Sequence, residues 1–262
     1  MSLSWRDRVI VGLAPLRLRL WRDPAPWPHR TAAPASIPCS VDANREPWQS
    51  VLAALTQALE KPEWQNAPLQ VVLSDQFVRY QILPWEKGLS HDAERLAYAR
   101  FHFNRVYGEA ADGWEIATSD EPPGCGAVAC AIDRTLLQAL RDLCAARRTR
   151  LHSVQPRFVA LYNAVRRRLN GAETGLAAFE PGRLTVGLIK RARVVSLTTR
   201  AIDGAPGEAL TALLDEAALQ GDEPHATADL FVLGAAAQPV GGNWRVQALP
   251  PSPAIATLTW ET

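Results

Sequence analysis

The chain has 262 residues, 47% hydrophobic and 21% charged, so it can fold as one large globular domain or two smaller ones. This composition excludes a disordered, collagen-like or coiled-coil chain as the main architecture. The formal net charge is +1, which argues against a nucleic-acid partner because counterion release needs a basic excess.

The charge is unevenly distributed along the chain. Residues 134–200 hold fourteen Arg and Lys against three acids, a formal charge of +11, and the rest of the chain carries −10. Two interpretations stay open for this basic stretch. It forms either solvated helix faces or a surface for an acidic partner or anionic lipid headgroups.

The first third of the chain is predicted to alternate strands with a helix, from its apolar runs and one 3.6-residue period. In order, the predicted elements are a hairpin of strands at Val9–Leu13 and Leu16–Trp21, a loop at Asp23–Pro38, a third strand at Ile37–Val41, a helix from Trp48 to Leu59 and a buried strand at Leu69–Leu73.

The middle of the chain begins with a strand of alternating pattern, with Val78, Tyr80 and Ile82 on one face, closed by Pro84-Trp85. The remaining elements predicted here are a helix capped by Ser90 or Asp92 and ending near Tyr107, strands at Trp114–Thr118 and Ala127–Ile132, a helix capped by Asp133, a strand at Leu151–Val154 and a helix opened by Pro156.

The last third repeats the opening pattern. Its predicted elements are strands at Leu176–Phe179, Leu184–Ile189 and Val194–Thr199, a helix at Gly207–Leu219 and a strand at Leu230–Leu233. Strands alternating with helices predict an α/β fold, and the doubled unit predicts two related lobes facing a cleft. We expect a first lobe at 1–172, with a subdomain inserted around 74–132, and a smaller second lobe at 173–262.

Several common site types have no pattern in the sequence. It has no P-loop, no dinucleotide-binding glycine motif, no nucleophile elbow and no His pair at metal-ligand spacing. We therefore assign no catalytic or metal-ligating residue. Four cysteines outside CxxC pairs are interpreted as buried thiols, and the absence of a signal peptide or of an apolar span of roughly 20 residues predicts a soluble cytoplasmic protein.

The most distinctive segment reads Val-Val-Leu-Ser-Asp-Gln-Phe-Val-Arg-Tyr-Gln-Ile-Leu-Pro-Trp, from Val71 to Trp85. It resembles a segment of the actin-like proteins of bacterial type IV pilus and type II secretion machineries, the PilM-like proteins and the cytoplasmic part of GspL-like proteins. The doubled unit also fits this family. The resemblance implies an actin-like fold of duplicated ribonuclease-H-like lobes around an inter-lobe cleft.

The resemblance also locates the positions that would bind a nucleotide, if binding is retained. They are Gly12 and Arg17 in the first phosphate loop, Glu180 and Gly182 in the second, and Gly234 in the adenosine loop. The family's first Asp, which organises magnesium, is replaced by Ile10, and its hydroxyl residue by Leu13. Because magnesium needs oxygen ligands, the resemblance implies a degenerate site, with ATP and magnesium as doubtful cofactors.

The resemblance thus implies a cytoplasmic scaffold that docks the tail of an inner-membrane pilus or secretion protein, peripheral to the membrane through that partner. Arg79, Tyr80 and Trp85 are the candidate partner-binding residues, and the arginines at 147, 148, 150 and 166–168 are candidates for an anionic membrane surface. The alternative is an active Mg-ATP-dependent ATPase or phosphotransferase of the same fold. A basic nucleic-acid adaptor is a weaker third possibility.

Overall fold

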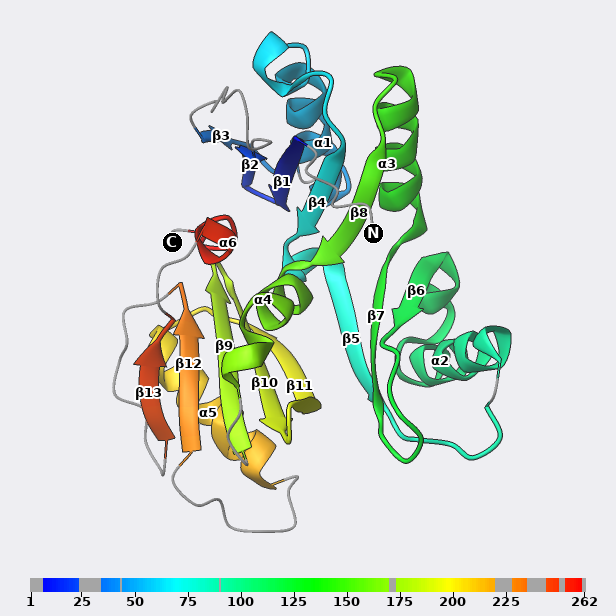
Figure 1. The fold of residues 1–262 in the computed structure, drawn as a ribbon, viewed down its shortest axis with the longest axis vertical. Helices are drawn as coiled ribbons and strands as arrows, with labels where there is room; N and C mark the ends of the chain where they lie inside the picture. The colour runs from blue at the N-terminus through cyan, green and yellow to red at the C-terminus, as the bar shows by residue number, and fades with distance from the viewer. Residues whose placement is uncertain are drawn as a thin grey trace. The chain divides into compact units, whose positions relative to one another are not determined.

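The computed structural model describes residues 7–23, 34–42, 44–89, 91–169, 173–219, 228–234, 244–249 and 253–260. Contacts group the chain into two compact units, whose helices and strands are labelled in Figure 1. Unit 1 comprises 1–78 and 132–157, and unit 2 comprises 79–131 and 158–262. The predicted lobes divide the chain at other residues and stay a prediction.

Unit 1 is a five-stranded sheet of order β3-β2-β1-β4-β8 with two helices. Its core comes from alternating apolar residues of β1 and from the face of α1 that holds Val51 and Leu55. The α1 helix packs on β1 and β2, and α3 packs on β8 and α1. The elements are β1 (Arg8–Ala14), β2 (Arg17–Asp23), β3 (Ala35–Pro38), α1 (Pro47–Ala58), η1 (Pro62–Trp64), β4 (Leu69–Leu73), η2 (Asp75–Phe77), α3 (Arg134–Ala146) and β8 (Leu151–Pro156).

Two predicted boundaries in this unit are wrong. The third strand is Ala35–Pro38, not Ile37–Val41, because pairing with β2 fixes its register, with Leu20 opposite Ala35. Most of the predicted 23–38 loop lies outside the described residues. Pro156 does not open a helix but ends β8, where it pairs with Leu73 of β4.

Unit 2 contains a three-stranded sheet of order β5-β7-β6 with one long helix, which we call the inserted subdomain after the prediction for 74–132. Its core gathers around Phe103, which stacks on Tyr107 at 6.1 Å and meets Trp114 edge-on at 6.3 Å. The elements are β5 (Val78–Leu83), α2 (Asp92–Tyr107), η3 (Gly108–Gly113), β6 (Trp114–Thr118) and β7 (Ala127–Asp133).

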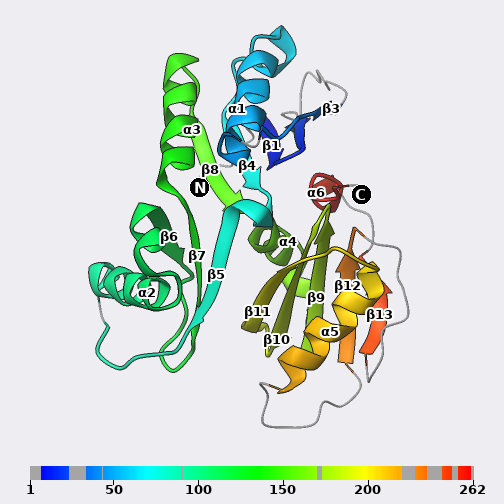
Figure 2. The same cartoon turned by 180° about the vertical axis from the view of Figure 1, so that it is seen from behind.

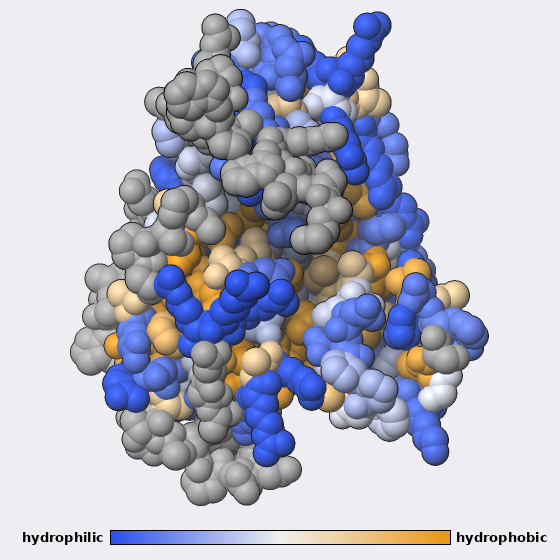
Figure 3. All heavy atoms as spheres, in the orientation of Figure 1, coloured by the Kyte–Doolittle hydropathy of each residue, from blue (hydrophilic) through white to orange (hydrophobic). Residues whose placement is uncertain are grey.

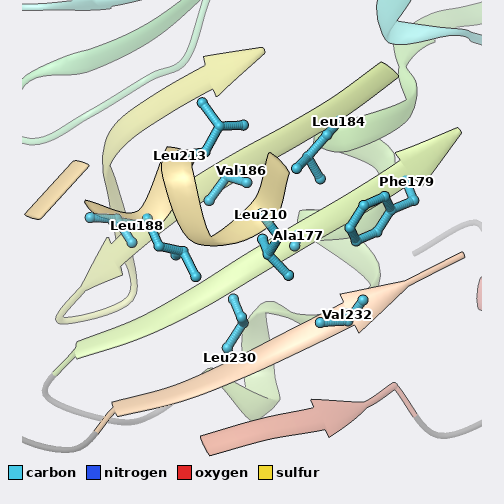
Figure 4. Packing of buried hydrophobic residues seen from close by; sticks show 10 residues of the cluster. Ala177, Phe179, Leu184, Val186, Leu188, Leu210, Leu213, Leu230 and Val232 are labelled. Atoms are coloured by element: carbon cyan, nitrogen blue, oxygen red, sulfur yellow. The ribbon is translucent and has the colours of Figure 1, made fainter. Parts of the chain in front are cut away.

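The rest of unit 2 is a second five-stranded sheet, of order β11-β10-β9-β12-β13. The α5 helix covers one face (Figure 2), and its Leu210 and Leu213 pack against Val186 and Leu230 of the strands (Figure 4). The elements are α4 (Arg157–Val165), η4 (Arg166–Arg168), β9 (Glu173–Glu180), β10 (Arg183–Lys190), β11 (Arg193–Ala201), α5 (Pro206–Leu219), β12 (Ala228–Leu233), β13 (Trp244–Ala248) and α6 (Pro253–Ala256).

The two five-stranded sheets have the same topology. In each, the first strand pairs antiparallel with the second, and the second pairs antiparallel with the third. The first strand also pairs parallel with the strand that follows the helix, β4 or β12. A further parallel strand, β8 or β13, completes each sheet. The predicted duplication of a ribonuclease-H-like unit is therefore confirmed.

Helix caps and cysteines refine the local predictions. Asp133 caps α3 as predicted, since its Oδ1 accepts from the backbone N–H of Thr135 at 2.6 Å. Asp92 is the first residue of α2 and the N-cap is His91, whose backbone N–H donates to Glu94 Oε2 at 3.1 Å; Ser90 lies outside the described residues. All four cysteines are free, but only Cys144 is buried, so the prediction of four buried thiols is wrong.

Candidate functional site

The inserted subdomain carries a groove of about 300 Å³ at the end of β5. One wall is the chain that leaves β5, where Trp85 is 47% exposed, and the helix α2 with Tyr98. The opposite wall is the connection between β6 and β7. The lining residues are Leu83, Pro84, Trp85, Glu86, Leu89, Arg95, Tyr98, Thr118, Ser119, Asp120, Glu121, Pro123, Cys125 and Ala127.

The groove wall between β6 and β7 is held by Ser119. Its backbone N–H donates to Val128 O at 2.8 Å, and its Oγ accepts from the Val128 N–H at 3.0 Å. The same Oγ lies 3.1 Å from Glu121 Oε1. On the opposite wall, Arg95 forms an ion pair with Asp92 and lies 3.8 Å from Asp120. Ser119, Glu121 and Arg95 therefore already have partners within the fold.

The charge of the groove is negative. Its lining contains the carboxylates of Glu86, Asp120 and Glu121 against one cation, Arg95. The rest of the lining is largely apolar, with the ring of Trp85 exposed. An edge strand ends here, because β5 lies at one side of its sheet. Such an arrangement suits a segment with apolar and basic residues, because the carboxylates attract the basic side chains and the exposed ring can pack on the apolar ones.

The three predicted partner-binding residues do not share one environment. Trp85 is exposed and lines the groove. Tyr80 is only 9% exposed, and its ring meets Phe158 of α4 edge-on at 6.4 Å. Arg79 is half-buried and has an interaction partner. Their role in binding stays a prediction, but Tyr80 takes part in the core of unit 2.

In unit 1, the predicted phosphate-loop residues lie in the β1–β2 hairpin. Gly12 pairs with Arg19, and Arg17 pairs with Ala14. Leu13, at the position where the resemblance expects a hydroxyl, has 0% exposure and contributes to the core. Ile10, at the expected Asp, is half-buried. Neither side chain supplies an oxygen to a cation.

In unit 2, the structure places Gly234 against the residue that precedes Glu180. Gly234 has a φ of +97°, and an added Cβ would lie 2.6 Å from the carbonyl oxygen of Phe179, the residue before Glu180. Packing against β9 therefore explains this glycine without a ligand. Glu180 is 2% exposed. Gly182 has a φ of +73° and follows Pro181 in the β9–β10 turn.

Nothing in these positions tests nucleotide binding, so the assignment of Gly12, Arg17, Glu180, Gly182 and Gly234 stays a prediction. Within the described ranges, no three His, Cys, Asp or Glu side chains gather in a way that could hold a metal ion. Over the same ranges, no helix has the length and apolar character needed to span a bilayer.

The basic stretch falls into separate parts. In unit 1, Arg147 donates to Glu60 Oε1 at 2.9 Å and to the carbonyl oxygen of Thr56 at 3.0 Å, so its charge is partly used within the fold. Arg148 and Arg150 are exposed. In unit 2, the three arginines of η4 are all exposed.

Sequence reasoning missed the second wall of the groove, and it assigned no ligand to the β10–β11 turn. The groove wall at 118–127 lies about forty residues from Trp85, so no local pattern joins them. The turn carries Arg191 between Lys190 and Arg193, which the sequence alone presents as a solvated hairpin tip.

Comparison with known proteins supports the fold. No protein-family model matches the chain, and no curated protein matches its sequence. One similar solved structure is a Bacteroides thetaiotaomicron protein of actin-like ATPase fold and unknown function, with 9% identity and a TM-score of 0.62 over 89% of this chain and 84% of that one. A second is the cytoplasmic domain of EpsL, an inner-membrane component of the Vibrio cholerae type II secretion system, with 12% identity and a TM-score of 0.60 over 96% of this chain and 92% of that one. A third is a PilM–PilN type IV pilus biogenesis complex, with 12% identity and a TM-score of 0.58 over 87% of this chain and 81% of that one.

At these identities the similarity is one of fold. The chain has an actin-like α/β fold, and the resemblance to PilM-like and GspL-like proteins that the Val71–Trp85 segment predicted is confirmed at that level. What the neighbours bind or assemble with belongs to those proteins.

Proposed function

We propose that this protein is a cytoplasmic actin-like scaffold of a pilus or secretion-type envelope machine. It docks a short cytoplasmic segment of an inner-membrane partner and is held at the membrane through that partner. Two structural neighbours support this reading, because one is the cytoplasmic domain of an inner-membrane secretion component and the other is a pilus biogenesis complex.

The groove beside Trp85 is the observation that carries the proposal. Trp85 is 47% exposed and lines a groove, and tryptophan is among the residue types that most often anchor a partner. The acidic lining around it favours a segment with basic residues beside an apolar one. An extended tail lying in this groove would place its side chains against Trp85 and Tyr98.

The test uses synthetic peptides that copy the short cytoplasmic segments of inner-membrane proteins recovered with the full chain. Trp85→Ala should weaken binding of the correct peptide by about tenfold or more, since buried tryptophans dominate such contacts. Phe101→Ala is the matched control, because Phe101 is 61% exposed on α2 and does not line the groove. Equal loss for both variants, or no loss for Trp85→Ala, would contradict the proposal.

The second part of the proposal is that the nucleotide site of this scaffold is degenerate. The burial of Leu13 supports this part, because its side chain has no oxygen for magnesium, and Gly234 is explained by its packing on Phe179 without a ligand. Calorimetric titration with Mg-ATP should give no heat up to millimolar ligand. Low-micromolar binding that Glu180→Gln abolishes would instead support the active ATPase or phosphotransferase.

A contact with anionic lipid remains part of the proposal for unit 1. Arg148 and Arg150 are exposed beside the C-terminal end of α3, and each cation near an anionic leaflet contributes about 1 kcal/mol. Sedimentation with anionic vesicles at low salt should be reduced in Arg148→Gln/Arg150→Gln. Unchanged sedimentation of the double variant would remove this surface.

A further inference from the structure

A cluster of six cations lies at one end of the second sheet of unit 2. It joins the 3₁₀ turn η4 with the β10–β11 turn, and we call it the arginine tip. Its members are Arg166, Arg167, Arg168, Lys190, Arg191 and Arg193.

Tyr162 of α4 ties the two turns together. Its hydroxyl donates to the carbonyl oxygen of Ala192 at 2.7 Å, which fixes the β10–β11 turn against the helix that η4 extends. Burial and Glu121 raise the pKa of Tyr162, whereas Arg166 lowers it, so the Arg166 charge acts on the same hydroxyl. Arg166 and the β10–β11 turn therefore lie near the same hydroxyl.

Most of these charges have no carboxylate partner among the described residues. Arg166, Arg167, Arg168 and Arg191 are exposed, and the described part of the chain forms no ion pair with them. Lys190 lies 3.3 Å from Glu173 Oε1, and Arg193 donates to the sulfur of Cys125. At least four positive charges are thus available to a ligand.

The backbone of the β10–β11 turn is unfavourable for the residues it carries. Arg191 and Ala192 have φ angles of +51° and +60°, the conformation of a two-residue hairpin turn that asparagine and glycine adopt at little cost. Arg191 therefore lowers the stability of the turn. It also places a cation at the tip of a hairpin that is hydrogen-bonded to Tyr162. Strained residues of this kind gather at functional sites.

We propose that the arginine tip binds an acidic stretch of a protein partner. Successive residues of a 3₁₀ helix point about 120° apart, so the arginines of η4 face different directions and a flat bilayer meets only some of them. A flexible acidic chain can follow all three. The guanidinium fork also matches a carboxylate in a bidentate pair.

The tip is continuous with the groove, which favours a protein ligand over a lipid or a nucleic acid. Arg193 contacts Cys125, and Cys125 lines the groove beside Trp85. The groove itself repels an acidic chain through Glu86, Asp120 and Glu121, so the acidic stretch belongs at the tip. Hydrophilic side chains indeed project over α4 and β9 on the face drawn in Figure 3. The choice of a protein ligand rests on the proposed function of the groove, whereas none of the six cations of the tip lines the groove.

The experiment measures fluorescence anisotropy of a labelled peptide of alternating Glu and Ser, with a Gln–Ser peptide for comparison. At low salt the acidic peptide should bind the full chain, and affinity should fall as salt is added. Arg167→Ala/Arg191→Asn should weaken binding about tenfold, because two charged contacts are lost while asparagine suits the turn. The control Arg105→Ala/Arg141→Ala removes the same charge from exposed positions on α2 and α3 and should change affinity less than about twofold.

Three results would overturn the proposal. One is an absence of binding at low salt, and the second is an equal loss in both double variants, which marks a net-charge effect. The third is tighter binding to anionic phospholipid vesicles, or to a single-stranded oligonucleotide, than to the acidic peptide. If the tip variant abolishes that binding and the control variant does not, the site serves another class of ligand. If the tip variant still binds the groove peptide as tightly as the unmodified protein does, a failure of this proposal is distinguishable from a failure of the proposed function.

Discussion

Gly187 of β10 offers the sharpest test of how unit 2 is assembled. A Cβ at this position would lie 2.4 Å from Cζ and 3.2 Å from Cε1 of Phe158, the second residue of α4. Phe158 is 1% exposed and also meets Tyr80 of β5 edge-on at 6.4 Å. Glycine here lets one aromatic ring lie between the second sheet and the inserted subdomain.

Gly187→Ala should therefore destabilise the protein. Carbon atoms pack at roughly 3.5–4 Å, so the ring must move by about 1 Å in an interior that is already close-packed. Overpacking of this size costs about 1–3 kcal/mol. Gly204→Ala is the matched control, because an added Cβ there meets nothing within 4 Å and its φ is not positive. It should be neutral or slightly stabilising.

Urea unfolding followed by circular dichroism measures both variants, and a double-mutant cycle with Phe158→Leu identifies the cause. Leucine is smaller than the ring, so the cost of Gly187→Ala should fall by about 1 kcal/mol or more in that background. The reasoning is refuted if the cost is the same with Phe158 and with leucine. It is also refuted if Gly187→Ala behaves like Gly204→Ala.

Three further predictions concern the pH dependence, a cap and a turn. Burial raises the pKa of the Cys144 thiol from 9.0 to about 11, so the stabilisation of its protonated form is present below pH 9 and lost as pH rises to 11. Between pH 9 and 11 the free energy of unfolding, measured in urea, should fall by about 2–3 kcal/mol through this thiol. Cys144→Ala should show a smaller fall over the same pH range, and an equal fall in the variant contradicts the prediction. Asp133→Ala removes the oxygen that accepts from the Thr135 N–H at 2.6 Å and should cost about 1 kcal/mol in urea unfolding, while Asp133→Asn, which keeps an acceptor, should cost less. Ala192→Gly removes the Cβ from a residue at φ +60° and should raise the thermal midpoint, with a gain of about 1 kcal/mol, and a lower midpoint would exclude strain in this turn.

Local patterns in the sequence were enough for most of the elements and for the fold class. Three such patterns are the 3.6-residue period of α1, the apolar run of β4 and the Asp133 cap. Each depends only on residues close together in the sequence, so each could be predicted without a structure. The doubled order of strands and helix, together with the Val71–Trp85 resemblance, predicted the actin-like fold that the shared sheet topology confirms.

Tertiary structure decided whatever depends on residues far apart in the chain. The place of β3 follows from pairing with β2, and the burial of Tyr80 follows from the ring of Phe158, which lies 78 residues later. The groove forms only when Trp85 meets the connection between β6 and β7, and the arginine tip only when Tyr162 reaches Ala192. Periodicity records which face of an element is apolar, but not which distant segment covers that face. The groove and the arginine tip, which we propose as partner surfaces, are made by such distant segments, so the fold could be predicted from the sequence while these surfaces needed the structure.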